Sequence, residues 1–373
     1  MKNSLLSSLY LQAMIKKIFS FTFILTLLIF SCSSDSDDSS SEVWEQKSVM
    51  LTNWADNFIS PSYTTLTNNL ILLEESGNTF ANSTNQQNLD NLRSSFINAY
   101  MSWQYVEMFD IGLAEENYYK SKMNIYPTTV SRIELNIQNG NTDFNNSNNY
   151  SAQGFPALDY ILYGIEASDE LILSKYNTEP QYLSYLSQVI SQMLQNTNPI
   201  VEDWESYRNT FISSVENTAT SSVNKMTNDF IYYYEKGFRA NKFGIPAGVF
   251  SGGALPDKIE AFHNQNISKA LALEGFQAIK NFYNGNGGVS LRQYISEVST
   301  AEYSDLSTEI LDQFNIAESL INGLDDNFYN QILTNNIQVL EAYDAIQQGT
   351  ILLKTDMLSV LQIPTDYVDA DGD

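Results

Sequence analysis

Cysteine and histidine are almost absent from this sequence. Among 373 residues there is one cysteine, Cys32, and one histidine, His263. A single cysteine excludes an internal disulfide, a cysteine-based zinc site and a two-cysteine redox motif. A single histidine excludes a zinc site with two or three His ligands within one chain, and a Ser-His-Asp triad would have to use His263. Little familiar catalytic chemistry is left.

Basic residues are also scarce. The chain has 19 Lys and Arg against 44 Asp and Glu, which gives a net charge of −25. Such a charge repels the phosphate backbone, so no nucleic acid is expected as a partner. The acidity is compatible with a cationic ligand or a metal, but on an exported protein it more often serves solubility. The charge alone names no ligand.

Motifs for nucleotides and for serine hydrolases are missing as well. No Gly-x-x-x-x-Gly-Lys-Ser/Thr phosphate loop occurs. Ser251 follows Gly248-Val249-Phe250 and lacks the glycine two positions earlier that a nucleophile elbow requires. No catalytic residue is predicted from these patterns.

Residues 1–31 are typical of a lipoprotein signal peptide. Lys16 and Lys17 precede an apolar run, residues 18–30, and the sequence then reaches Cys32. The run is well short of the roughly 20 residues of a membrane-spanning helix. We therefore expect lipid attachment at Cys32. An ordinary secretory signal is the alternative, and it would leave Cys32 without a role.

Residues 32–41 are rich in Ser and Asp and are predicted to form a disordered acidic tether, with the folded part starting near Glu42. The tether resembles export signals that follow the acylated cysteine in surface-exposed lipoproteins. We expect an outer-membrane lipoprotein that faces the periplasm or, as the favoured alternative, the cell surface. Whether translation starts at Met1 or Met14 is left open.

Apolar residues recur at helical spacing. One helical face is formed by residues that alternate steps of three and four, namely Leu89, Leu92, Phe96, Ala99, Trp103 and Val106. Strand-type alternation is hard to find. The predicted helices are 43–75, 86–111, 128–138, 155–165, 180–218, 221–240, 256–283, 302–323 and 328–361. This pattern predicts an all-α fold of two bundles packed side by side, 42–215 and 216–373.

Breakers and turn residues mark the ends of these helices. Pro61 is predicted to kink the first helix, and Asn136–Asn149 and Asn284–Gly288 are predicted loops. Tyr232, Tyr233 and Tyr234 are phenols that could bind ferric iron or haem. Because consecutive residues point to different sides of a helix, core packing is the preferred interpretation.

Three stretches carry a resemblance to the imelysin family, also called the M75 peptidase family. Gln153–Gly164, with the sequence QGFPALDYILYG, resembles the family signature Gly-x-His-x-x-Glu followed by an apolar stretch and a glycine. Met123–Pro127 and Lys242–Ser251 are similar to stretches of imelysin-like lipoproteins. The likeness spans nearly the whole mature chain. It implies two pseudo-symmetric helical bundles, a functional cleft where they meet, and a frequent association with iron or haem uptake.

The signature is degenerate in this sequence. Pro156 stands at the family's His position and Asp159 at its Glu position. Asp159 can still offer one oxygen to a cation if other helices add ligands, and Glu107, Asp110 and Glu134 are the carboxylates available for this.

The alternative for the same segment is purely structural. Gly154 and Pro156 would simply start a helix, with Phe155 and Leu158 packed between the bundles. Both interpretations stay open at this point. The candidate ligand-binding residues are Trp103, Glu107, Tyr126, Glu134, Gly154, Pro156, Asp159, Gly244, Phe250 and Ser251, with Asp159 as the one metal-ligand candidate.

Three functions are compatible with these observations. The first is a non-enzymatic ligand-binding or accessory lipoprotein of iron or haem uptake, with iron, another divalent cation or haem as candidate ligand and a TonB-dependent uptake system as candidate partner. The second is a metallopeptidase, against which Pro156 argues. The third is a protein that docks on a partner or a polysaccharide. An exposed aromatic patch around Tyr118 and Tyr119 would favour this third function.

Overall fold

The computed structural model describes residues 37–140 and 142–367. All regular elements in these two ranges are helices, and no strand occurs in them. The predicted all-α class is therefore confirmed. The expected signal peptide and Cys32 lie outside the described residues, so both stay predictions. Among the helices that are described, none combines the length and the apolar character needed to cross a membrane.

The contacts divide the chain into two units, Met1–Glu45 and Gln46–Asp373. Of the first unit only the start of helix α2, Asp37–Trp54, is described. Helix α2 begins inside the segment predicted as a tether, so that prediction is wrong for residues 37–41.

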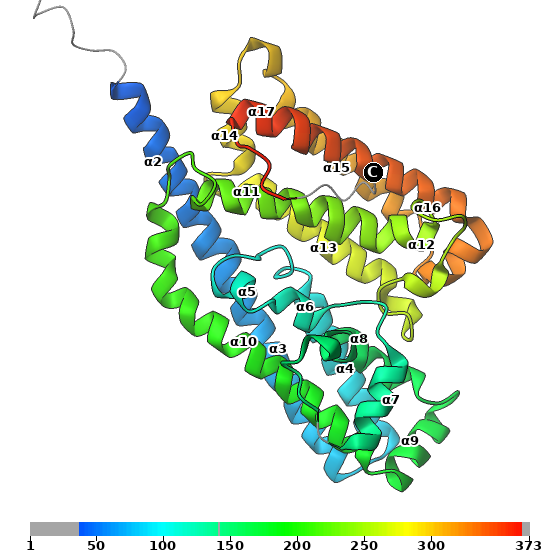
Figure 1. The fold of residues 1–373 in the computed structure, drawn as a ribbon. Helices are drawn as coiled ribbons and strands as arrows, with labels where there is room; N and C mark the ends of the chain where they lie inside the picture. Colours follow the sequence, from blue (N-terminus) through cyan, green and yellow to red (C-terminus); the bar gives the residue numbers. More distant parts are fainter. Residues whose placement is uncertain (1–36, 141, 368–373) are drawn as a thin grey trace, which may run out of the picture. The chain divides into compact units, whose positions relative to one another are not determined.

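Helix α3, Ser60–Asn82, packs against two other long helices of the second unit (Figure 1): α4, Gln86–Trp103, and α10, Gln181–Ser213. The apolar face predicted for α4 is buried, with Leu89, Leu92 and Phe96 at 0% exposure. The start of α4 is set by Asn85, whose side chain accepts a hydrogen bond from the backbone N–H of Asn88.

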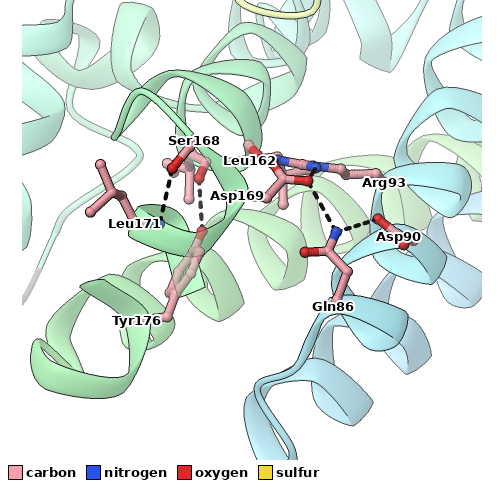
Figure 2. A network of polar contacts seen from close by, with 9 residues as sticks. Gln86, Asp90, Arg93, Leu162, Ser168, Asp169, Leu171 and Tyr176 are labelled. Atoms are coloured by element: carbon pink, nitrogen blue, oxygen red, sulfur yellow. Dashed lines mark hydrogen bonds and ion pairs between the residues drawn. The ribbon is translucent and has the colours of Figure 1, made fainter. Parts of the chain in front are cut away.

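Shorter elements lie between α4 and α10. They are α5, Leu113–Glu116, α6, Tyr119–Met123, α7, Val130–Asn139, η2, Ser147–Ala152, α8, Gly154–Asp159, η3, Tyr160–Gly164, and α9, Asp169–Thr178. Arg93 of α4 holds the last two in place: it donates to both carboxylate oxygens of Asp169, at 2.8 and 2.9 Å, and to the carbonyl oxygen of Leu162 (Figure 2). Gln86 reaches the same carboxylate at 3.0 Å.

The remaining helices form a second group of neighbours. They are α11, Ser222–Tyr232, η4, Tyr233–Gly244, α12, Ile245–Ala247, α13, Ser268–Asn284, α14, Leu291–Val298, α15, Leu306–Asn322, α16, Phe328–Ile351, η9, Leu352–Met357, and α17, Leu358–Leu361. The π-helical η4 contacts both α13 and α16, and α13 also contacts α4. The predicted division into bundles 42–215 and 216–373 and their pseudo-symmetry stay predictions.

Several predicted helix boundaries are wrong. Pro61 does not break the first helix, because a π-helical turn, η1, Ala55–Ile59, precedes it and Pro61 lies in the first turn of α3, where its missing N–H costs little. The helix predicted from residue 86 ends at Trp103 rather than 111, and the one predicted from 180 ends at Ser213 rather than 218. Helices α9 and α14 were not predicted.

The predicted helix 256–283 is wrong in its first half. Residues 256–267 form a loop with two short 3-10 turns, η5, Pro256–Lys258, and η6, Gln265–Ile267. The backbone N–H groups of His263 and Asn264 bond to the side chain of Asp159 instead of to a helical turn. The exposed Tyr118–Tyr119 patch that would favour a docking protein is not formed by both residues, because Tyr118 is 66% exposed but Tyr119 only 2%.

Gly154 provides a test of how α8 is seated. Its φ is +72°, and a Cβ there would lie 2.1 Å from the carbonyl oxygen of Met123. Gly140 has a similar φ of +75° with nothing within 4 Å. We expect Gly140→Ala to cost about 1–2 kcal/mol for the left-handed backbone alone, and Gly154→Ala to cost at least about 2 kcal/mol more because the backbone must move. Urea denaturation measures both, and equal losses would contradict this seating of α8.

Candidate functional site

Four segments of the second unit bring polar side chains together in the interior. The turn after α4 carries Gln104 and Glu107, the residue after α6 is Asn124, η4 carries Lys242, and the loop before η6 carries Glu260. All five are buried, with exposures between 0 and 7%. Burial of charged groups is expensive unless they are paired and hydrogen-bonded, so the partners of each group decide what the cluster can do.

Lys242 and Glu260 satisfy one another. The Nζ of Lys242 contacts the Glu260 carboxylate and donates to Oε1 of Gln104 at 2.8 Å. The other carboxylate oxygen of Glu260 accepts from Asn124 at 2.9 Å and from Gln104 at 3.2 Å. This buried ion pair therefore has the additional hydrogen bonds that such a pair needs.

Glu107 is the incompletely bonded member of the cluster. Its Oε1 accepts from Asn124 at 3.3 Å, whereas its Oε2 is buried without a hydrogen-bond partner among the described residues. Burial raises the pKa of Glu107 to about 7, an effect that Lys242 opposes and Glu260 reinforces. A buried carboxylate with one free oxygen is costly, so this atom is a ready acceptor for a donor supplied from outside.

Glu107 lines a pocket of about 190 Å³. The other lining residues come from α6 and the turn after it and from the α11–η4 segment: Lys120, Ser121, Asn124, Ile125, Tyr126, Tyr232, Tyr233, Lys236, Gly237 and Asn241. We call this the Glu107 pocket. Pockets for drug-sized ligands measure about 300–1,000 Å³, so the Glu107 pocket suits a smaller molecule.

Tyr126 and Tyr233 of the Glu107 pocket are hydrogen-bond donors and not phenolates. Burial, together with the carboxylates of Glu260 and Glu107, raises the pKa of Tyr126 well above its usual value, and the same causes act on Tyr233. The hydroxyl of Tyr233 is buried without a partner among the described residues. Of the Tyr232–Tyr234 run, Tyr233 and Tyr234 are buried, as core packing predicts, and Tyr232 borders the pocket.

A second pocket of about 190 Å³ shares Tyr126 with the first and contains the degenerate motif. Pro156, Asp159 and His263 line it. Asp159 is 2% exposed, and its two oxygens accept from the backbone N–H groups of His263, at 2.7 Å, and Asn264, at 2.9 Å. Burial raises the pKa of Asp159 to about 7, and these two hydrogen bonds oppose the shift. Asp159 thus anchors the loop that carries Glu260.

The motif residues do not fit a resident metal. Pro156 lies in the first turn of α8 and offers no ligand atom. His263 packs against the ring of Tyr160, and burial lowers its pKa to about 4, which leaves it in the neutral form that can bind a metal, but it would be the single nitrogen ligand. Within residues 37–140 and 142–367, no three His, Cys, Asp or Glu side chains are grouped to share a metal ion. Asp159 therefore lacks the supporting ligands that its prediction as a metal ligand requires.

The other predicted carboxylates are engaged elsewhere. Asp110 pairs with Lys120 at 2.9 Å. Glu134 accepts from the hydroxyls of Tyr160, at 2.6 Å, and Tyr182, at 2.5 Å, and lines neither pocket. Neither carboxylate is placed to assist Asp159.

Four further predicted site residues also lie outside the two pockets. Trp103 is fully buried against Tyr119 and Phe155. Gly244 lies where a Cβ would meet Phe250 and Tyr343, and Ser251 is exposed, with its hydroxyl on the carbonyl oxygen of Gly253. Two of the predicted residues, Glu107 and Tyr126, meet at the Glu107 pocket. Tyr126 also lines the second pocket, together with Pro156 and Asp159. Gly154 begins helix α8, which carries Pro156 and Asp159.

Few features of the sequence indicated the remaining members of the cluster. Gln104, Asn124, Lys236, Lys242 and Glu260 were not predicted. Lys236 and Glu260 fall in the predicted amphipathic helices 221–240 and 256–283, where charged residues are normally exposed, and Lys242 lies between these two helices. A single signal was present: Asn124 and Lys242 lie inside the stretches Met123–Pro127 and Lys242–Ser251 that carry the family resemblance.

These observations define an all-helical protein with a small internal polar pocket and no metal-binding group among its described residues. The family model for imelysin, the M75 peptidase family, matches residues 59–353. The chain belongs to the imelysin family.

Two solved structures have a similar fold. An imelysin-like protein from Psychrobacter arcticum aligns with a TM-score of 0.68 and 16% identity over 87% of this chain and 98% of that one. A putative iron-regulated protein A precursor from Parabacteroides distasonis aligns with a TM-score of 0.65 and 15% identity over 88% of this chain and 97% of that one. At this identity the likeness concerns the fold. None of the curated proteins matches the sequence.

Glu107 makes the stability depend on pH. Because burial raises its pKa to about 7, the folded state keeps a proton that the unfolded state has lost at intermediate pH, and stability falls as pH rises from about 4.5 to about 7. Full ionisation costs at most about 3 kcal/mol at one site. In Glu107→Gln we expect the free energy of unfolding to decline less over this pH range. The decline that remains comes from Asp159, because its pKa is also raised to about 7.

The measurement is urea denaturation at several pH values between 5 and 8, with Glu134→Gln as the matched control. Glu134 lies outside both pockets, so this variant should keep the full decline. A Glu107→Gln protein with the same decline as the wild type would show that Glu107 ionises normally in the folded state.

Proposed function

We propose that this protein is a non-enzymatic, ligand-binding component of iron uptake in the bacterial cell envelope, and that its ligand site is the Glu107 pocket. The observation that carries the proposal is the buried, unbonded Oε2 of Glu107 in the wall of that pocket. Evolution rarely leaves a buried acceptor without a partner, because the desolvation cost is about 1–3 kcal/mol. A bound ligand with a donor group removes this cost.

The association with iron is supported by two points outside the pocket. The chain belongs to the imelysin family, and a protein of similar fold is named as a putative iron-regulated protein A precursor. The lipoprotein-type N-terminus supports a place in the outer membrane, facing the periplasm or the cell surface. A TonB-dependent uptake system is the partner we propose for this setting.

The chemistry of the pocket favours a small organic ligand over a bare metal ion or haem. One unpaired carboxylate does not make a metal site, and burial holds Tyr126 and Tyr233 in their neutral form by raising the pKa of each. Haem is at least as large as a drug-sized ligand, and pockets for such ligands measure about 300–1,000 Å³, so a pocket of about 190 Å³ is too small to enclose it. The ligand that we propose is therefore a small organic molecule that accompanies iron or signals its supply, and it is neither iron itself nor haem.

A metallopeptidase is the alternative that the family name brings, and the geometry argues against it. A metal-activated water needs at least a pair of ligands and a general base. Here Pro156 stands at the position of the family's histidine, and both carboxylate oxygens of Asp159 accept hydrogen bonds from backbone N–H groups. No step can be assigned to these residues.

The proposal predicts a growth phenotype. A strain that lacks the protein should grow poorly when iron is limiting, and the wild-type gene should restore growth. Glu107→Gln should fail to restore it, because the charged acceptor is lost, whereas Glu134→Gln should succeed. Growth curves in chelator-treated medium measure this, with immunoblots to show equal protein levels. Full complementation by Glu107→Gln would overturn the assignment of the site.

The absence of catalysis is tested with the purified full-length protein. Incubated with casein and Zn²⁺, it should release no peptides above background. Hydrolysis that disappears in Asp159→Asn but persists in Glu134→Gln would restore the metallopeptidase. In titrations with Fe²⁺, Zn²⁺ and haem, the wild type and Asp159→Asn should behave alike, because Asp159 binds backbone and not a ligand.

A further inference from the structure

The charges of the cluster do not balance without an outside group. Lys242 and Glu260 form a complete ion pair, which leaves the Glu107 carboxylate as the uncompensated charge. Lys120 is the other cation that acts on Glu107. It is already held by Asp110 at 2.9 Å and lies 5.0 Å from the ring centre of Tyr232. The missing positive charge must therefore be a proton or a cationic group of a ligand.

The same pocket offers an unmatched positive charge. Lys236 of η4 lines it, is half-buried and makes no ion pair among the described residues. Glu107 is the one carboxylate in the wall of the pocket. An anionic group bound near Lys236 would meet little repulsion.

The size and the remaining walls restrict the ligand further. A volume of about 190 Å³ equals that of about six water molecules at roughly 30 Å³ each. The rings of Tyr126, Tyr232 and Tyr233 supply aromatic surface, which favours a cationic group. Asn124 and Asn241 add amide groups that can donate and accept.

From these charges and this size we infer that the Glu107 pocket binds a small zwitterion of the free α-amino acid type, with its ammonium group on Glu107 and its carboxylate on Lys236. The inference rests on the Glu107 pocket as the ligand site and adds the class of ligand. It involves recognition alone, with no bond made or broken. The ammonium replaces the proton that Glu107 otherwise needs.

The test is calorimetric titration of the purified full-length protein with small neutral L-amino acids, their N-acetyl derivatives and their amides. Removing the ammonium by acetylation, or the carboxylate by amidation, should each weaken binding about tenfold or more, as expected for a lost charge-assisted hydrogen bond. If a plain amine bound as tightly as the amino acid, the pocket would bind a cation without any contribution from Lys236, and this would contradict the zwitterion. Failure of every amino acid to bind would overturn the inference.

Variants connect each ligand group to its residue. Glu107→Gln should weaken binding of the free amino acid about tenfold or more but leave that of the N-acetyl derivative unchanged. Lys236→Met should likewise weaken binding of the free amino acid about tenfold or more. It should leave binding of the amino-acid amide unchanged, because the amide has no carboxylate. The matched controls are Glu134→Gln and Lys122→Met, at positions outside this pocket. Equal losses for all ligands would indicate a merely structural effect.

The pH dependence provides an independent readout. Because an ammonium binds the ionised form of Glu107, affinity should rise between about pH 6 and 8, and this rise should vanish in Glu107→Gln. The other groups that face Glu107 are Lys242, Glu260, Lys120 and the phenols Tyr100, Tyr126 and Tyr233. The phenols stay neutral in this range, since burial raises the pKa of each well above its usual value.

The two proposals can fail separately. If no amino acid binds but Glu107→Gln still fails to restore growth at low iron, the ligand class is wrong and the site stands. If amino acids bind and Glu107→Gln restores growth fully, the site binds a zwitterion but has no part in iron uptake.

Discussion

The buried ion pair between Lys242 and Glu260 is the interaction on which the site depends. It joins η4 to the loop before α13, and through Gln104 and Asn124 it also joins the turn after α4 and the end of α6. A pair of this kind is stable only when its remaining hydrogen bonds are made. Here Gln104 and Asn124 make these hydrogen bonds, and Oε2 of Glu107 is left without a partner among the described residues. The pocket and its unbalanced charge follow from this distribution of partners.

The degenerate motif has a structural role beside this cluster. Asp159 accepts the backbone N–H groups of His263 and Asn264 and so fixes the loop in which Glu260 lies. Gly154 and Pro156 start a helix, as the structural interpretation predicts, and Asp159 positions backbone, whereas ligand binding by Asp159 stays a prediction. A carboxylate can keep this role after its metal-binding neighbour has been replaced by proline.

The sequence predicts helices where their stability comes from a repeated apolar face, as in α4 and α10, although both helices end earlier than predicted. It fails where tertiary contacts decide, as in residues 256–267, whose amides bond to a side chain about a hundred residues away. The site shows the same limit. Glu107, Tyr126 and Asp159 could be named from a resemblance, whereas Lys242, Glu260 and Lys236 could not, because spacing along one helix does not reveal which charges of other segments meet it.

The central claim is that Glu107 is a buried carboxylate short of one partner. The most direct measurement is an infrared pH titration of its carboxylate band, read as the difference between the wild type and Glu107→Gln. A midpoint near pH 7, consistent with a pKa of about 7, that moves lower when a zwitterion is bound would agree with this account. A midpoint near the ordinary value for glutamate, about 4.3, in the protein without ligand would contradict it.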